Sequence, residues 1–233
     1  MTFSLVGRCA ETGMFGVAIT TSSIAVASRC PWARAGVGAV ATQNVTDPRL
    51  GNQGLDLLAR GMSAPEAMNA LMKAAPHPEH RQVTMIDAKG RTAHWSGAKT
   101  LGTNNVAPGE DCIAAGNLLQ NPDVPAAMAR AFAQSKGRHL ADRLLLGLEA
   151  GIVAGGEMGP VHSAGLLVVH EQSWPLVDLR IDWSDDSPIR PLKRLWEDFQ
   201  PQMDAYITRA LDPNAAPSYG VPGDMPGDMP GEK

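Results

Sequence analysis

Short apolar and β-branched runs dominate the first part of the chain, and they predict strands. Two such runs, at 2–7 and 15–21, flank the turn sequence Glu-Thr-Gly at 11–13, so we expect an amino-terminal hairpin. The stretch that follows contains RCPWARAG and is broken by Pro31. The next run, at 36–43, is therefore a third or fourth strand, and its glycines favour close approach of another backbone or a ligand.

Helical spacing of apolar residues begins after a polar loop, NVTDPRLGNQG. The spacing predicts a helix over roughly 54–60, which Gly61 ends. Ser63 and Glu66 then have the spacing of a capping box, with a proline in the first turn. This pattern predicts a second helix that stops before Pro76.

The rest of the chain alternates hairpins with helices. Further strands are expected at 82–87, 92–95, 111–118, 163–170 and 176–181, and helices at 124–134, 139–150 and 188–211. Strands joined by tight turns are antiparallel, and helices segregated from strands favour an α+β layered domain over a Rossmann-type repeat. The stretches GEMG and GNQG lack the spacing of a nucleotide-binding fingerprint.

The composition is that of a folded chain with a sizeable core. Of the 233 residues, 44% are hydrophobic and 19% are charged, with a formal net charge of -4. Disorder is therefore not indicated, and no basic excess is present to hold nucleic acid. The apolar runs are too short to cross a membrane, and the start lacks a signal-peptide pattern. Three scattered cysteines favour buried thiols in a reducing, cytoplasmic compartment.

The carboxyl-terminal end differs in composition from the rest. The sequence VPGDMPGDMPGEK contains PGDM twice. Proline and glycine at this density, with few apolar side chains, cannot bury a core. We therefore expect a single domain over 1–213 and a disordered Pro/Gly-rich tail over 214–233.

Several stretches together resemble one known family. They are MTFSLV, GVAITTSS, PWARAGVGAVATQ, NVTDPRLGNQGLDLL, AAGNLL, DLRIDW and PLKRLWEDF. They resemble the DUF1028 family, which is placed in the N-terminal nucleophile (Ntn) hydrolase superfamily. The resemblance implies a four-layer αββα sandwich of two antiparallel sheets. Relatives in the superfamily hydrolyse amide bonds. The leading hypothesis is therefore an amidohydrolase that cleaves a C–N amide bond in a small-molecule substrate, without a metal or organic cofactor.

Thr2 is the residue on which this implied chemistry depends. If Met1 is removed, Thr2 carries a hydroxyl nucleophile and a free α-amine that can accept the hydroxyl proton. The ordinary pKa of an α-amine, about 7.7–8, suits that role. A chain that retains Met1 has an acylated nitrogen at Thr2, which cannot act as a base. A threonine after methionine is common in itself, and the resemblance makes the nucleophile the leading interpretation.

Other polar residues are expected near Thr2. Ser22 and Ser23 end the second strand, which lies beside the start of the first, so they are candidates to orient the amine or relay a proton. Proteasome-type relatives have an acidic residue in this region, and polar capping of the strand is the alternative role. Gln43 and Asn44 stand where the resemblance places an oxyanion hole. A simple turn is the alternative there.

Asn117, Arg29 and Arg34 are the candidate substrate-binding residues. Asn117 is a polar side chain within an apolar strand, so it needs a structural or ligand partner. Arg29 and Arg34 flank the sequence CPW. Either guanidinium could bind a substrate carboxylate or replace the lysine of proteasome-type relatives. A surface ion pair is the alternative.

Other functions stay open at this point. His77 and His80 are spaced like a metal pair, but the proline between them prevents a regular helix from presenting both, so no metal site is predicted. A non-catalytic Ntn-like scaffold that retains Met1 and binds a small ligand or partner is the second candidate. Sheet sandwiches of this type often associate, and we expect a homo-oligomer.

Overall fold

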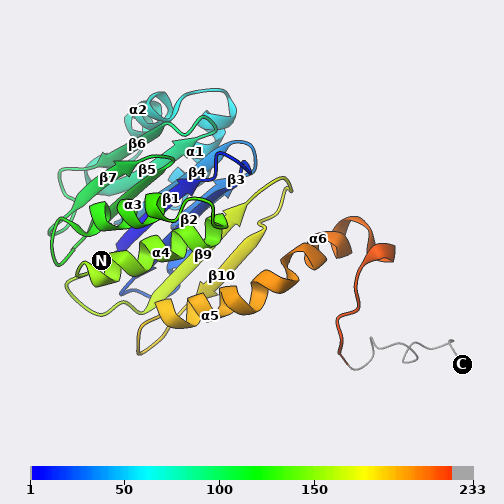
Figure 1. Cartoon of the computed structure of the whole chain (residues 1–233). Helices are drawn as coiled ribbons and strands as arrows, with labels where there is room; N and C mark the ends of the chain where they lie inside the picture. The colour runs from blue at the N-terminus through cyan, green and yellow to red at the C-terminus, as the bar shows by residue number, and fades with distance from the viewer. Residues whose placement is uncertain (1, 222–233) are drawn as a thin grey trace, which may run out of the picture. The chain divides into compact units, whose positions relative to one another are not determined.

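The computed structural model describes residues 2–221, and in this part of the chain the strands form two antiparallel sheets (Figure 1). The larger sheet has the strand order β10-β9-β2-β1-β8-β7. Its strands are β1 (Thr2–Arg8), β2 (Phe15–Thr21), β7 (Asn105–Gly109), β8 (Cys112–Asn117), β9 (Ser163–Val169) and β10 (Val177–Ile181). The smaller sheet has the order β3-β4-β5-β6. Its strands are β3 (Pro31–Arg34), β4 (Gly38–Asn44), β5 (Arg81–Asp87) and β6 (Thr92–Ser96).

Helices cover the outer face of each sheet. The smaller sheet is covered by α1 (Arg49–Ala59) and α2 (Ala64–Ala74). The larger sheet is covered by α3 (Val124–Gln134) and α4 (Leu140–Val153), which lie across its strands in Figure 1. The inner faces contact each other mainly through β1 and β2 on one side and β3 and β4 on the other. The layers are therefore helix, sheet, sheet and helix, which confirms the αββα architecture.

Strand β1 is buried on both faces because it lies between a helical layer and the second sheet. Successive side chains of a strand point to opposite faces. Val6 belongs to the same packed cluster as Ile86 of the smaller sheet. Leu5 faces α4, where a Cβ added at Gly147 would come within 2.3 Å of a Leu5 methyl group. Burial on both sides explains why apolar and polar residues alternate only loosely along this strand, with Leu5 and Val6 adjacent to each other.

The amino-terminal hairpin and the capping-box helix form as predicted. Strands β1 and β2 pair along their whole length, with Thr2 opposite Thr21. Ser63 caps α2: its hydroxyl accepts the Glu66 N–H, and the Glu66 carboxylate accepts the Ser63 N–H. The turn sequence and the capping box were therefore sufficient to predict the hairpin and the start of α2.

Helix α1 begins at Arg49, well before the predicted start at 54, so the second half of the expected polar loop is helical. Asp47 starts the helix, because its carboxylate accepts the Arg49 N–H at 3.1 Å. Glycine has a low helix propensity, yet Gly51 lies inside this helix. The reason is a close contact, since a Cβ at Gly51 would come within 2.0 Å of the Trp32 indole.

Two edge strands, β3 and β7, were not assigned from the sequence. Each contains a proline, Pro31 or Pro108, and each has a neighbouring strand on one side only. Proline has no N–H to donate to a ladder, so edge positions tolerate it where central strands do not. A proline within an apolar run therefore does not exclude a strand, provided that the strand lies at the edge of a sheet.

The single helix expected over 188–211 is divided in the structure. Helices α5 (Ile189–Phe199) and α6 (Met203–Leu211) are separated by a short 3-10 segment that contains Pro201. Proline lacks the N–H of a helical hydrogen bond and clashes with the preceding turn. The apolar periodicity was correct on either side, but the proline decides where the helix ends.

Contacts along the chain define one compact unit that ends at Trp196 and a second that begins at Glu197. Within the second unit, the Phe199 and Tyr206 rings stack with their centroids 5.9 Å apart. The two PGDM repeats of the expected tail lie outside the described residues. The domain boundary at 213 stays a prediction.

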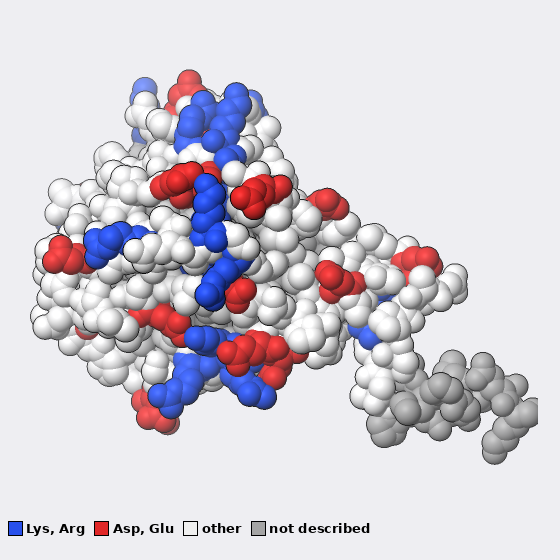
Figure 2. Space-filling model, in the orientation of Figure 1, with Lys and Arg blue, Asp and Glu red and all other residues white. Residues whose placement is uncertain are grey.

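The surface carries charges of both signs. Figure 2 shows Lys and Arg interspersed with Asp and Glu on the face that α3 and α4 cover. This mixture is consistent with the small formal net charge of -4. Within residues 2–221, no helix combines the length and the apolar character needed to cross a bilayer.

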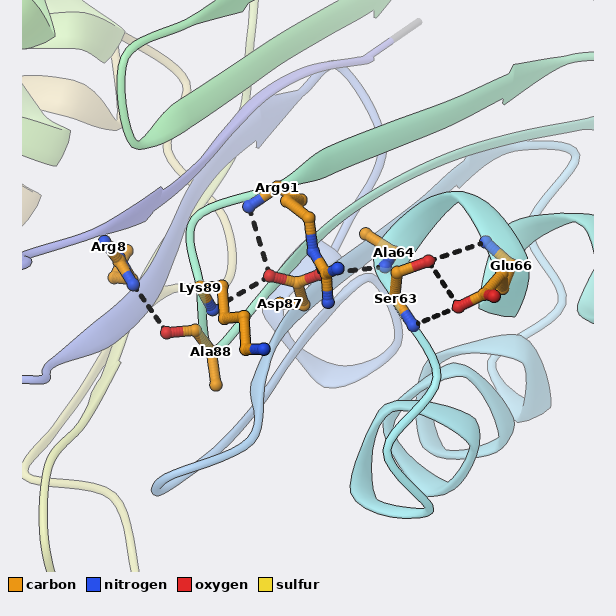
Figure 3. A network of polar contacts seen from close by, with 8 residues as sticks. All are labelled: Arg8, Ser63, Ala64, Glu66, Asp87, Ala88, Lys89 and Arg91. Atoms are coloured by element: carbon orange, nitrogen blue, oxygen red, sulfur yellow. Dashed lines mark hydrogen bonds and ion pairs between the residues drawn. The ribbon is translucent and has the colours of Figure 1, made fainter.

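Asp87, at the end of β5, joins α2 to the following turn (Figure 3). One carboxylate oxygen accepts the Ala64 N–H at 2.9 Å, and the other accepts the N–H groups of Lys89 and Arg91. The Arg91 guanidinium pairs with the same carboxylate at 2.7 Å. Burial raises the pKa of Asp87, but these hydrogen bonds outweigh burial and hold the pKa below its ordinary value.

We expect Asp87→Asn to reduce the free energy of unfolding by roughly 2–3 kcal/mol at neutral pH, because it weakens several charge-assisted hydrogen bonds at once. A depressed carboxyl pKa stabilises the fold above the unfolded-state pKa of about 3.9, and this contribution is lost as the pH falls through the folded-state pKa. Urea unfolding should therefore show the wild type and the variant converging in acid.

The matched control is Asp56→Asn, which removes one exposed ion pair with Arg34. This change should alter the free energy of unfolding by less than about 0.5 kcal/mol. Equal effects of the two substitutions would contradict the role assigned to Asp87.

Candidate functional site

Thr2 begins β1, one of the two central strands of the larger sheet, and lies between Thr21 and Asn117 of the neighbouring strands. Its side chain shares a face with Ser4, which hydrogen-bonds to the smaller sheet, so both side chains point between the sheets. In the chain that carries Met1, Thr2 is 6% exposed. The predicted nucleophile therefore lies at one end of the sandwich, between its two sheets.

A line of hydroxyl groups connects Thr2 with Arg29. Thr2 Oγ1 lies 3.1 Å from Thr21 Oγ1, which lies 3.3 Å from Ser23 Oγ. Arg29 Nη2 donates a hydrogen bond to Ser23 Oγ at 2.8 Å, and its Nη1 donates to two carbonyl oxygens of the same loop. Ser23 and Arg29 are thus linked to Thr2 through Thr21, a residue that sequence reasoning missed. The hairpin register, which sets Thr21 opposite Thr2, could have identified it.

Gln43 and Asn117 belong to a buried network of neutral side chains between the sheets. Ser4 Oγ donates to Gln43 Oε1 at 2.7 Å, and Gln43 Nε2 donates to Gln82 Oε1 at 2.8 Å. Asn117 Nδ2 donates to the same Gln82 oxygen at 3.1 Å. All four residues are at most 1% exposed. This network joins the two sheets next to Thr2, and it uses both ends of the Gln43 amide.

Asn117 retains one acceptor without a partner. Its Oδ1 is buried and accepts no hydrogen bond from the described residues. A buried polar atom left in this state costs roughly 1–3 kcal/mol. Because Asn117 is the ladder neighbour of Thr2, this oxygen is suited to an N–H donor at the end of β1.

Asn44 and Arg34 make structural contacts. Asn44 Nδ2 donates to the His80 carbonyl at 2.6 Å, and its Oδ1 accepts the Leu101 N–H at 3.2 Å. Asn44 also has a left-handed backbone, with a φ of 75°. Arg34 pairs with Asp56 at 2.9 Å, at the opposite end of β4 from Asn44. The structure therefore does not bring Arg34 to the other candidate residues.

Glu157 is an acidic residue at this end of the sheet that sequence reasoning missed. It forms an isolated bridge with Leu119, just beyond the end of β8. It is 6% exposed, and neither carboxylate oxygen accepts a hydrogen bond of normal geometry from the described residues. Burial raises the pKa of Glu157 to about 8, against the opposing effects of the positive charge at the chain's amino terminus and of nearby Ser22. An acidic side chain therefore lies beside Ser22, although the residue at position 22 itself is a serine.

A cavity of about 370 Å³ adjoins Glu157. It is bordered by the loop that contains Glu157, by the end of α4 and by residues 185–187. Its ionisable residues are Glu157, Asp185 and Asp186, which are all acidic. Such a boundary favours a neutral or positively charged ligand group over a carboxylate.

His77 and His80 have the sequence spacing of a metal pair. His77 has a left-handed backbone with a φ of 54°, and His80 Nε2 lies 3.7 Å from the Glu79 carboxylate. Across residues 2–221, no group of three or more His, Cys, Asp and Glu side chains is arranged to hold a metal ion. The two histidines thus have no third ligand in the described part of the chain.

Known proteins resemble the chain over most of its length. A family model described as "Family of unknown function (DUF1028)" matches residues 2–192. A DUF1028 protein from Silicibacter pomeroyi has a similar crystal structure, with a TM-score of 0.79 and 29% identity over 85% of this chain and 89% of that chain. Anbu (ancestral beta-subunit) from Yersinia bercovieri is more distant, with a TM-score of 0.42 and 10% identity over 87% of this chain and 96% of its own. No curated protein matches the chain.

The buried carboxyl group of Glu157 should make stability depend on pH. Its pKa is raised from 4.5 to about 8, so between these values the folded chain holds a proton that the unfolded chain has lost. The free energy of unfolding should therefore fall, by an amount on the order of a few kcal/mol, as the pH rises from about 5 to 8. Glu157→Gln keeps the shape of the side chain but cannot ionise. Urea unfolding of this variant should therefore lack the pH dependence of the free energy of unfolding.

Glu110→Gln is the matched control, because Glu110 is exposed and pairs with Lys136 at the surface. This variant should retain the pH dependence of the wild type. Parallel stability curves for the wild type and Glu157→Gln would contradict an uncompensated buried acid at position 157.

Proposed function

We propose that this chain, which belongs to the DUF1028 family, is an N-terminal-threonine amidohydrolase that cleaves a C–N amide bond in a small molecule. The observation that carries the proposal is the Thr2 hydroxyl at the end of a central strand, between the sheets and linked through Thr21 and Ser23 to Arg29. Thr2 acts as the nucleophile, and its own α-amine acts as the base once Met1 has been removed.

The reaction has two stages. Thr2 Oγ1 attacks the amide carbonyl carbon while the α-amine takes the hydroxyl proton. The C–N bond of the tetrahedral adduct then breaks and the proton passes to the leaving amine, so an ester on Thr2 remains. Water attacks this ester, the same amine accepts its proton, and the acid product leaves with Thr2 restored.

The line of hydroxyl groups supports this role by fixing the Thr2 side chain. Arg29 donates to Ser23 Oγ, and Thr21 Oγ1 lies within hydrogen-bond distance of both Ser23 Oγ and Thr2 Oγ1. These contacts restrict the rotation of the Thr2 hydroxyl group. Arg29 polarises the line from its far end, and it is therefore a positioning residue.

Two acceptors suit the ammonium group that forms when the amine takes up the proton. Asn117 is the ladder neighbour of Thr2, and its Oδ1 has no partner among the described residues. Glu157 lies near Ser22 and bridges Leu119, two residues beyond the ladder neighbour of Thr2. With a pKa of about 8, Glu157 is largely protonated at neutral pH. An ammonium group that forms nearby lowers this pKa and favours the carboxylate, which in turn stabilises the protonated amine. Glu157 thereby supplies the acid that positions 22 and 23 lack.

The polar network beside Thr2 and the cavity beside Glu157 both favour a small, uncharged amide or ureide as the substrate. The network between the sheets consists of hydroxyl and amide side chains without formal charge. The cavity beside Glu157 has only acidic ionisable residues. A substrate carboxylate would be repelled by these acids, whereas a neutral amide can exchange hydrogen bonds with the amide groups.

A non-catalytic scaffold that binds a small ligand is the second candidate, and the 6% exposure of Thr2 in the chain that carries Met1 favours it. If Met1 is retained, the Thr2 nitrogen is acylated and cannot accept a proton. Intact-mass measurement separates the two candidates. A mass short by one methionine permits the enzyme, and retained Met1 favours the scaffold.

We also infer that the chain forms a homo-oligomer. In the described part of the chain, β6 and β10 each end a sheet, so each has backbone groups unpaired along one side. Exposed strand edges of this kind can pair with another chain. A monomeric mass in light scattering would refute this inference.

Thr2→Ala removes the nucleophile and keeps the amine, so we expect kcat/KM to fall by at least about 1,000-fold. The measurement is a screen of small amides, ureides and acylated amino acids with the processed wild type and the variant. A chain extended by one residue ahead of Thr2 keeps the hydroxyl but blocks the amine, and it should be equally inactive.

Ser23→Ala interrupts the hydroxyl line and should lower kcat by roughly tenfold, as expected for the loss of one hydrogen bond. Arg34→Ala is its control and should leave kcat unchanged, because Arg34 pairs with Asp56 at the other end of β4. Undiminished activity in Thr2→Ala would refute the assignment of the nucleophile.

A further inference from the structure

Cys9 lies beyond the opposite end of β1 from Thr2, about 23 Å away along the strand. It begins the tight turn between β1 and β2, where its N–H donates to the Met14 carbonyl and its carbonyl accepts the Gly13 N–H, both at 2.9 Å. The residue is 8% exposed. Its environment is therefore independent of the proposed catalytic site.

Arg143, on α4, is a buried cation near Cys9. It is 6% exposed, and its guanidinium lies over the Phe132 ring, 3.9 Å from the centroid. Nε and Nη2 reach the Phe132 carbonyl only at 3.4 Å, and Nη1 makes no hydrogen bond within residues 2–221. No carboxylate of these residues lies within ion-pair distance of Arg143. The guanidinium therefore has no carboxylate partner among the described residues, and its positive charge can stabilise a negative charge that forms nearby.

Cys9 and Arg143 line the same cavity, whose volume is about 30 Å³. A cavity of this size holds one or two water-sized molecules. The other ionisable residues of its wall are Glu11, Glu110, Asp111 and Lys136. Two of the acids are already paired, with Arg8 and Lys136, and the third is exposed. The Cys9 sulfur shares this cavity with Arg143. Cys112, whose pKa the Arg143 charge also lowers, does not line the cavity.

The surroundings of Cys9 favour its thiolate. Burial raises the pKa of the Cys9 thiol, but hydrogen bonds from Thr12 and the neighbouring backbone, together with the Arg143 charge, bring the pKa below its ordinary value. In contrast, burial raises the pKa of Cys30, and it raises that of Cys112 to about 12. The thiolate is the nucleophilic form of cysteine. The chain thus has one thiol favoured for reaction and two that serve as internal references.

We propose that Cys9 is a site of oxidation by small hydroperoxides, for which hydrogen peroxide has the right size. The thiolate sulfur attacks one peroxide oxygen: an S–O bond forms as the O–O bond breaks, and the leaving hydroxide takes up a proton to become water. The sulfur loses two electrons, the peroxide gains them, and Cys9 becomes a sulfenic acid. Arg143 stabilises the thiolate before the attack and the charge on the departing oxygen during it.

The test treats the folded, full-length protein with hydrogen peroxide for timed intervals, removes the peroxide, and then unfolds the protein in the presence of dimedone, which traps sulfenic acid. Peptide mass spectrometry quantifies the label at all three cysteines. We expect labelling at Cys9 to be at least about tenfold faster than at Cys30 and Cys112. A bulkier hydroperoxide, tert-butyl hydroperoxide, should label Cys9 more slowly. In denaturant the three thiols should react at similar rates.

Arg143→Met removes the buried charge and should slow the labelling of Cys9 by roughly tenfold, equivalent to about one pKa unit in the thiol. Arg143→Lys should restore part of the rate, which separates the effect of charge from that of packing. Glu11→Gln changes an exposed acid of the same wall and should behave as the wild type. Labelling of Cys9 no faster than that of Cys112 in the folded protein, or unaffected by Arg143→Met, would overturn the proposal.

Discussion

The burial of β1 on both faces is the constraint on which the rest of the structure depends. The strand lies between α4 and the smaller sheet, and its two neighbours pair with it from Thr2 onward. A register shift of one residue would turn Thr2 toward the helices and set Phe3 between the sheets, so the register is strongly specified. The position of the Thr2 hydroxyl is therefore set by the pairing of three strands and does not depend on a flexible loop.

The same end of the sandwich shows how polar groups are accommodated in an apolar interior. The amides of Gln43, Gln82 and Asn117 satisfy one another across the gap between the sheets, so the interior needs no charge there. Arg29, which is charged, and Glu157, which burial keeps largely protonated at neutral pH, make no hydrogen bond to these amides. The gap between the sheets therefore avoids the cost of a buried ion pair.

Regular elements could be predicted from the sequence because their signals are local: periodic apolar positions, a capping box and tight turns. The sequence pattern placed Gly51 in a loop, because the contact with Trp32 that requires a glycine inside the helix cannot be recognised from the sequence. The prolines in β3 and β7 interrupted the pattern that would have predicted these edge strands. Ser23 could be placed near Thr2 from hairpin geometry alone. Arg34 could not be separated from the site, because that needed the direction of β3. Glu157 has no sequence pattern, since its burial follows from where a glycine-rich loop returns to β8.

The close seating of α1 against β3 limits how this protein can be altered. Replacing a glycine inside a helix with alanine ordinarily strengthens the helix, because alanine has the higher propensity and restricts the unfolded chain. At Gly51 the extra carbon would occupy space already taken by the Trp32 ring, and the helix could form only by lifting off the sheet. Trp32 and Gly51 therefore form a matched pair. A larger residue at position 51 would require a smaller one at position 32.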